Sequence, residues 1–300
     1  MPPAPPAMGP MTQREAFTVR HAVARGTEFL RAKGIESARL DAELLIGAAL
    51  HLDRLGLYLD MDRPLTESER AAARELLRRR ATHEPVAYIL GRREFRSRNF
   101  EVTRDTLIPR PETEELVDIA LAQLDRRFEG EASRYRLLEV GAGSGVIGIC
   151  LALELPAAQV VATEICAAAA DVARRNAATH GVGPRVDIRV QADLSGVQPP
   201  FHAVVSNPPY IRDDEFPKLM PDVRDFEPRQ ALTAGPDGLE VIRMILAGAP
   251  ALLKPGGFVL LEIGCGQGPD IEPLAAAAGL GDTTILKDYA GLDRYALIAR

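Results

Sequence analysis

The four residues at positions 207–210, Asn-Pro-Pro-Tyr, carry the clearest chemical signal in the sequence. They follow the apolar run HAVVS, and α/β proteins bind ligands beyond the carboxyl ends of such strands. Pro208 and Pro209 fix the backbone and have no N–H. The turn is therefore stiff, and the Pro208 carbonyl can point at a ligand.

This turn suits one kind of chemistry. An amide or ring amino nitrogen is a poor nucleophile, because its lone pair is delocalised. If the Asn207 side-chain oxygen and the Pro208 carbonyl bind its two hydrogens, the nitrogen is oriented for reaction, and the ring of Tyr210 can cover the planar group. We therefore predict a transfer reaction at a planar NH2 group, with Asn207, Pro208, Pro209 and Tyr210 as the catalytic residues.

Two similar glycine phrases, LLEVGAGSG at 137–145 and LLEIGCGQG at 260–268, each follow an apolar strand. Either one can form a tight turn whose N–H groups face a ligand. Neither has the GxGxxG spacing of a dinucleotide-binding loop, which argues against a hydride-transfer enzyme. Glu164 and Asp288 each lie about 20 residues after their phrase, the spacing of an acid that binds a ribose diol, so this test does not separate the two.

The residues that follow each phrase do separate them. The first phrase leads into a helical stretch in which Gly148 permits close packing on the sheet, and further strands follow it. The second phrase leads to Pro269 and Asp270, ordinary residues for the first turn of a helix, and lies close to the end of the sequence. We predict that the first phrase is the cofactor loop, with Gly141, Ala142, Gly143, Ser144 and Gly145 as binding residues and Glu164 as the acid.

The elements that position these residues alternate between strand and helix after residue 113. Seven apolar runs predict a doubly wound, mostly parallel, Rossmann-like α/β sheet that ends in an antiparallel pair of strands. We expect four segments: a disordered Pro-rich tail at 1–14, a small helical bundle for docking at 15–84, a β-hairpin linker at 85–112 and the α/β domain at 113–300. In the linker, YIL (88–90) and NFEVT (99–103) are expected to be strands.

Composition limits the function classes. The chain has 300 residues with a formal net charge of −6, and no apolar run approaches the ~20 residues of a membrane span. The negative charge argues weakly against a surface built to bind nucleic acid, although the arginine-rich stretch at 78–98 is locally basic. Cys150, Cys166 and Cys265 lack metal-binding spacing, so we predict buried thiols, no metal and a cytoplasmic location.

Several motifs together resemble a known family. EVGAGSG, Glu164, the pair AD at 192–193 and NPPY are similar to methyltransferases that use S-adenosylmethionine to methylate planar nitrogen. More narrowly, EPVAYILGRREF, IPRPETEE, EPRQALTAGPDGLEVIRMI and KDYAGLDRYALIAR resemble the protein-(glutamine-N5) methyltransferases that modify peptide chain release factors.

The resemblance implies a site and a partner. It implies that the loop at 141–145 wraps the methionine part of S-adenosylmethionine, that Glu164 binds the ribose and that Asp193 and Leu194 lie near the adenine. It also implies that the glutamine of a Gly-Gly-Gln motif in a release factor sits on residues 207–210, beside the cofactor at Asn207, and that the helical domain docks this protein. A monomer is expected.

Two alternatives stay open. NPPY serves a flipped base equally well, so a nucleic-acid methyltransferase acting on adenine N6 or guanine N2 is the second hypothesis. A scaffold that binds no cofactor is the third. Arg110 and Glu112 match the family motif RPETE, but their chemistry alone assigns them no role.

Overall fold

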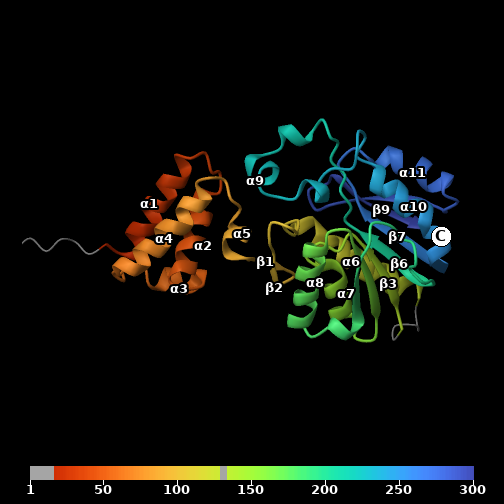
Figure 1. Ribbon diagram of the computed structural model, residues 1–300, viewed down its shortest axis with the longest axis horizontal. Helices are drawn as coiled ribbons and strands as arrows, with labels where there is room; N and C mark the ends of the chain where they lie inside the picture. The colour runs from red at the N-terminus through yellow and green to blue at the C-terminus, as the bar shows by residue number, and fades with distance from the viewer. Residues whose placement is uncertain (1–16, 129–133) are drawn as a thin grey trace, which may run out of the picture. The chain divides into compact units, whose positions relative to one another are not determined.

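The computed structural model describes residues 17–128 and 134–300, so the predicted tail at 1–14 lies outside the described residues (Figure 1). The chain divides into a unit that ends at Leu90 and a unit that begins at Gly91. In the described part of the chain, no helix combines the length and the apolar character needed to cross a bilayer.

The first unit is helical. Its helices are α1 (Val19–Arg31), α2 (Ala38–Ala49), α3 (Arg54–Leu59), α4 (Glu67–Arg80) and α5 (Val86–Leu90). A capping box starts α4, because the side chains of Thr66 and Glu69 bind each other's backbone N–H groups. The buried pair Arg80–Asp41, 2.7 Å between Nε and Oδ2, joins α4 to α2.

The segment after α4 differs from the prediction. Residues 88–90 were expected to form a strand, but they belong to α5, whose first turn is closed by N–H groups of Tyr88 and Ile89 donating to the Pro85 carbonyl. The hairpin lies just beyond, in β1 (Arg92–Phe95) and β2 (Arg98–Glu101). Arg96 and Ser97 both have positive φ at its turn, as a two-residue hairpin loop requires.

The second unit contains a seven-stranded sheet. Its strands are β3 (Arg136–Val140), β4 (Gln159–Glu164), β5 (Val186–Val190), β6 (Phe201–Ser206), β7 (Leu253–Glu262), β8 (Thr283–Lys287) and β9 (Asp293–Ala299). They lie in the order β5-β4-β3-β6-β7-β9-β8. The first five strands in this order pair in parallel, and β9 pairs antiparallel with both β7 and β8. The predicted sheet and its antiparallel final pair are confirmed.

Helices cover both faces of this sheet (Figure 1). One face packs against α6 (Pro111–Arg127), α7 (Val146–Glu154) and α8 (Ala167–Thr179). The other face packs against α10 (Glu240–Leu252) and α11 (Gly268–Ala277). Shorter elements are α9 (Pro221–Arg224) and the 3-10 turns η1 (Gly183–Arg185), η2 (Phe216–Lys218) and η3 (Arg229–Ala231). Three of these, η2, α9 and η3, lie in the long connection between β6 and α10.

The cysteine prediction needs a correction. Cys150 is buried on α7, but Cys166 is only half-buried at the start of α8, and Cys265 is exposed in the turn after β7. Both follow the carboxyl ends of strands, where the sheet opens to solvent, and their apolar neighbours in sequence did not reveal this.

Candidate active site

A cavity of about 390 Å³ lies at the carboxyl ends of β3, β4, β5 and β6. Its size falls in the ~300–1,000 Å³ range of small-molecule sites, and its position is the one that doubly wound sheets use for ligands. It brings together the loop after β3, the end of β4 and the turn after β6. The predicted residues that line it are Gly141, Ala142, Gly143, Ser144, Glu164, Asn207 and Pro209.

The loop after β3 is shaped by its glycines. Gly141, Gly143 and Gly145 all have positive φ, the region that other residues rarely adopt. The N–H groups of Gly141 and Ala142 both donate to the Thr163 carbonyl at 2.9 Å, which ties the loop to the end of β4. The loop leads directly into α7, whose N-terminus provides N–H groups for an anionic or polar ligand.

Close packing holds α7 on the sheet, as predicted. A Cβ on Gly148 would lie 2.4 Å from Oε2 of Glu139. The Gly148 N–H donates to that oxygen at 3.0 Å, while Oε1 of Glu139 has no partner in the described part of the chain. Burial raises the pKa of Glu139 to about 8; the Gly148 N–H opposes this rise, and repulsion from Glu164 adds to it.

Glu164 lies at the end of β4 and is buried. Its Oε2 accepts the N–H of Gly143 and its Oε1 accepts the N–H of Cys166, both at 2.8 Å. A carboxylate oxygen has a second lone pair for a further donor. The side chain thus shapes the glycine loop and can at the same time bind a hydroxyl group in the cavity.

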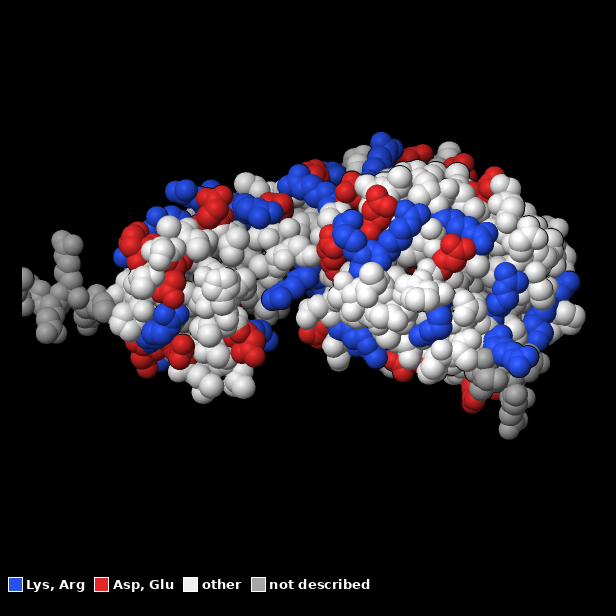
Figure 2. All heavy atoms as spheres, turned by 60° about the horizontal axis from the view of Figure 1, so that its bottom comes forward, with Lys and Arg blue, Asp and Glu red and all other residues white. Residues whose placement is uncertain are grey.

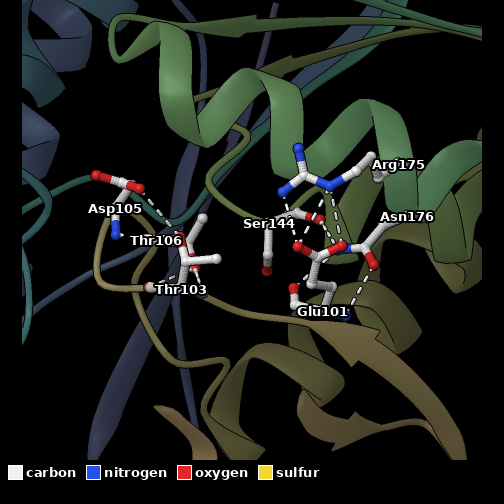
Figure 3. A network of polar contacts seen from close by, with 7 residues as sticks. All are labelled: Glu101, Thr103, Asp105, Thr106, Ser144, Arg175 and Asn176. Carbon is white, nitrogen blue, oxygen red and sulfur yellow. Dashed lines mark hydrogen bonds and ion pairs between the residues drawn. The ribbon is translucent and has the colours of Figure 1, made fainter. Parts of the chain in front are cut away.

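The backbone of Ser144 is bound by Asn176, and its hydroxyl has no hydrogen-bond partner among the described residues. Nδ2 of Asn176, on α8, donates to the Ser144 carbonyl at 2.8 Å and to the Glu101 carbonyl at 3.0 Å. Oδ1 of Asn176 accepts the Glu101 N–H at 2.8 Å, so one buried side chain joins β2 to the glycine loop (Figure 3). The Ser144 Oγ is buried without a hydrogen-bond partner among the described residues.

Asp193 and Leu194 directly follow Gln191 and Ala192, which line the cavity, but are not themselves among its lining residues. Oδ1 of Asp193 accepts from the N–H and the hydroxyl of Ser195, and these bonds hold the pKa of this exposed carboxyl below its usual range. Leu194 lies next to Gly248 of α10 and packs against the hydrophobic cluster between α10 and the sheet.

The turn at 207–210 begins at the cavity. Nδ2 of Asn207 donates to Thr113 Oγ1 at 3.0 Å, which leaves Oδ1 without a protein donor in the described ranges 17–128 and 134–300. No described donor binds the buried Pro208 carbonyl either. Asn207 Oδ1 is therefore an available acceptor on a residue that lines the cavity together with the glycine loop, whereas Pro208 is buried and is not among the lining residues.

Tyr210 belongs to a different surface. It lines a second cavity of about 690 Å³ together with Gly264, Cys265, Gly266 and Gln267 of the second glycine phrase. This phrase forms the end of β7, a tight turn and the start of α11, with Pro269 and Asp270 in the first turn, as predicted.

The RPETE motif joins α6 to the connection between β6 and α10. Arg110 Nη2 lies 2.5 Å from Oε1 of Glu227, which is buried, and the Ile108 N–H donates to the other oxygen at 3.1 Å. Tyr295 donates from its hydroxyl to the Glu112 carbonyl at 2.7 Å. Arg110 therefore has a structural partner that its position in the sequence did not reveal.

Other residues of the cavity were missed. Thr163, Ile165 and Cys166 flank Glu164, and their positions next to a strand end could have marked them. Arg104 and Asp105 come from the loop after β2, which is folded by bonds among Thr103, Asp105 and Thr106 (Figure 3). Others come from the connection after β6 and from α10, and include Gln230, Thr233, Glu240 and Met244; Thr113, at the start of α6, also lines the cavity.

Basic and acidic side chains alternate on the surface. On the face drawn in Figure 2, blue and red residues lie next to one another on each unit. Within the arginine-rich stretch at 78–98, four arginines pair with acids: Arg79 with Glu84, Arg80 with Asp41, Arg96 with Asp118 and Arg98 with Glu154. These acids offset the charge of four of the seven arginines in the stretch that the alternative nucleic-acid hypothesis would use.

Comparison with known proteins matches both units. Residues 21–91 match the family model described as the PrmC N-terminal domain, and residues 113–220 match the methyltransferase small domain. A structure of the hMettl16 catalytic domain in complex with the MAT2A 3'UTR hairpin 6 shares the fold, with a TM-score of 0.54 and 13% identity over 67% of this chain and 74% of that one.

Relatives similar over nearly the whole chain identify the family. Three of them carry the name release factor glutamine methyltransferase. The protein of Geobacter sulfurreducens is 42% identical over 95% of this chain and 98% of its own length. That of Cereibacter sphaeroides is 42% identical over 94% and 96%, and that of Chlorobaculum tepidum is 41% identical over 95% and 98%. With this similarity running through both the helical unit and the sheet that forms the cavity, the chain belongs to the release factor glutamine methyltransferase family.

Proposed function

We propose that this protein transfers the methyl group of S-adenosylmethionine to the side-chain nitrogen (N5) of the glutamine in the Gly-Gly-Gln motif of a peptide chain release factor. The observation that carries the proposal is the free acceptor Asn207 Oδ1, on a residue that lines the same cavity as the glycine loop. A primary amide has two N–H donors; we propose that Asn207 Oδ1 accepts one and the Pro208 carbonyl the other. The names of the relatives support the release factor as the substrate.

The residues around the cavity fit the proposed cofactor. The unpartnered Ser144 Oγ, the glycine loop at 141–145 and the N-terminus of α7 would hold its methionine part, and Glu164 would bind its ribose hydroxyls. Gln191, Ala192 and Ile165 line the part of the cavity beyond Glu164 and would surround the adenine. Bound there, S-adenosylmethionine supplies a methyl group on a positively charged sulfur.

Asn207 and Pro208 would do the work of orientation. By accepting both hydrogens of the glutamine NH2 group, they turn its lone pair toward the methyl carbon and make it more available. Bound S-adenosylmethionine would supply the methyl group to this nitrogen, and the surplus proton would leave the nitrogen for solvent. Positioning and hydrogen bonding supply most of the rate in such a site, and no strong general base is needed.

A protein substrate also fits the charges better than a nucleic acid does. Neutralising a phosphate backbone requires unpaired Lys and Arg side chains, and the arginines at 79, 80, 96 and 98 all have acidic partners. We assign the docking of the release factor to the helical unit and the reaction to the cytoplasm, where release factors act.

Labelled methyl transfer tests the proposal. Purified protein is incubated with methyl-labelled S-adenosylmethionine and a release factor, the same factor with its Gly-Gly-Gln glutamine changed to alanine, or total RNA and DNA. We expect label only on the intact factor. Label on RNA or DNA instead would replace the proposed substrate with an amino group of a base.

A further inference from the structure

The second glycine phrase lies directly behind the NPPY turn. Its strand, β7, is the parallel neighbour of β6, and Ser206 pairs with Leu261 at the end of the shared register. Asn207 and Glu262 are the next residues on the two strands. The phrase is thus placed to contact the turn at 207–210 rather than the cofactor loop.

A chain of hydrogen bonds joins Glu262 to Asn207. Thr113, in the first turn of α6, donates from Oγ1 to Oε2 of Glu262 at 2.8 Å and accepts from Nδ2 of Asn207 at 3.0 Å. Thr113 and Glu262 are 2% and 1% exposed, so the bond between them lies in a dry environment, where it is strong. The bond between Asn207 and Thr113 is partly buried, because both residues line the cavity.

The chain also sets the direction in which the Asn207 amide points. A threonine hydroxyl has one hydrogen, and Thr113 gives it to Glu262 when that carboxylate is ionised; burial raises the pKa of Glu262 to about 7. Thr113 can then only accept from Asn207, so Asn207 turns its NH2 group toward Thr113 and its oxygen away from it. The oxygen is the atom that must face the substrate amide.

The other end of the turn is held by Gln267. Its Nε2 donates to the Tyr210 carbonyl at 3.3 Å and to the Gly238 carbonyl at 3.1 Å, while its Oε1 accepts the Gly264 N–H at 2.8 Å. Glycine is needed at Gly238, which has positive φ, and a side chain at Gly264 would crowd this contact. A Cβ on Gly264 would lie 3.2 Å from the Tyr210 ring, and a Cβ on Gly238 would lie 2.3 Å from the Tyr210 carbonyl oxygen.

We propose that Thr113, Glu262 and Gln267 are positioning residues for the transfer reaction: Glu262, through Thr113, orients the Asn207 amide toward the substrate, and Gln267 fixes the backbone at Tyr210. This inference rests on the proposed function, because it takes Asn207 as the residue that binds the substrate NH2 group. It assigns the second glycine phrase a task in the site without a direct contact to the cofactor.

Two substitutions at Thr113 separate orientation from packing. Thr113→Val keeps the shape of the side chain and removes the hydroxyl, whereas Thr113→Ser keeps the hydroxyl and removes a methyl group. We expect Thr113→Val to lower kcat about tenfold or more, with the affinity for S-adenosylmethionine, measured by calorimetry, unchanged within about twofold. Thr113→Ser should recover most of the kcat.

Gln267→Met supplies a second, independent variant of similar length and should lower kcat at least about threefold, again with cofactor affinity retained. It carries the test if Thr113→Val does not fold. The matched control is Thr283→Val on β8, where the hydroxyl has no partner among the described residues. We expect its kcat to equal that of the unmodified protein.

Three results would overturn the inference: unchanged kcat in both Thr113→Val and Gln267→Met, an equal loss in Thr113→Ser and Thr113→Val, or a loss of cofactor affinity that matches the loss of kcat. A failure of the proposed function looks different. The unmodified protein would then label RNA or DNA and not the release factor, and the same variants, assayed on that acceptor, would still decide whether these residues orient Asn207.

Discussion

The Glu164 carboxylate accepts the backbone N–H of Gly143 at 2.8 Å, so the acid expected to bind the ribose also holds the glycine loop. Glu164→Ala removes both contacts, and we expect it to weaken S-adenosylmethionine binding about tenfold or more, since hydrogen bonds to a charged group are worth ~1.5–3 kcal/mol each. Titration calorimetry measures this loss directly. Glu164→Gln keeps a single carbonyl acceptor, so its affinity for S-adenosylmethionine should lie between that of the unmodified protein and that of Glu164→Ala. Unmodified affinity in Glu164→Ala would move the ribose site elsewhere in the cavity.

Asn207→Ala tests the NPPY turn. The variant loses the oxygen that would accept one hydrogen of the substrate amide, while the glycine loop and Glu164 stay in place. We therefore expect cofactor affinity close to that of the unmodified protein and turnover at least about tenfold lower, a loss of ~1.4 kcal/mol or more of transition-state stabilisation. Steady-state kinetics with a release factor and calorimetry with the cofactor measure the two quantities. Unchanged turnover would remove the orienting role of Asn207.

Neighbouring residues on α8 provide a matched pair for the third prediction. Asn176→Ala leaves the Glu101 N–H and two carbonyls, of Glu101 and Ser144, without their buried partner (Figure 3). We expect a loss of about 2 kcal/mol or more in the free energy of unfolding and weaker cofactor binding, because the glycine loop loses its support. Urea unfolding and calorimetry measure both.

Arg175→Ala is the control for this prediction. Its ion pair with Glu101 is bidentate, but the two side chains are 52% and 40% exposed. Exposed ion pairs contribute at most about 1 kcal/mol, so this variant should retain cofactor affinity. Equal effects of the two substitutions would show that the hairpin contact, and not the loop contact, matters.

Much of the fold followed from local patterns. The seven strands are apolar runs bounded by glycine, proline and polar residues, and each lies where its run predicted it. The YIL segment misled because β-branched and aromatic residues also suit a short buried helix, and Pro85 starts one there. An apolar run of three residues does not distinguish the two.

The site was predictable where its chemistry lies on one short segment. The glycine loop, Glu164 and Asn207 line one cavity, and each belongs to a motif within a few residues of a strand end. Thr113 and Glu262 are 149 residues apart and Arg110 and Glu227 are 117 apart, so these contacts depend on the register of the sheet and on the path of the connection after β6. A short sequence motif specifies neither the register of the sheet nor the path of this connection.

The raised pKa of Glu139 predicts how the free energy of unfolding depends on pH. Its pKa is near 4.5 when exposed and about 8 in the folded protein, because burial disfavours the charged form. Between these two values the folded protein holds a proton that the unfolded chain has released, so the free energy of unfolding falls as pH rises through this window. Glutamine cannot ionise, and Glu139→Gln should lack this contribution.

Urea unfolding near pH 5 and near pH 9 tests the sign, since the two values bracket the titration. We compare the free energy of unfolding of Glu139→Gln with that of the unmodified protein at each pH. This difference should shift in favour of the variant by a few kcal/mol from the low to the high pH, because a pKa difference of one corresponds to about 1.4 kcal/mol. Glu154→Gln, on the same helix α7 but exposed and paired with Arg98, is the control and should leave the pH dependence unchanged. An identical pH dependence in Glu139→Gln and the unmodified protein would mean that Glu139 is ionised in the fold, and that the unpartnered Oε1 is hydrated rather than dry.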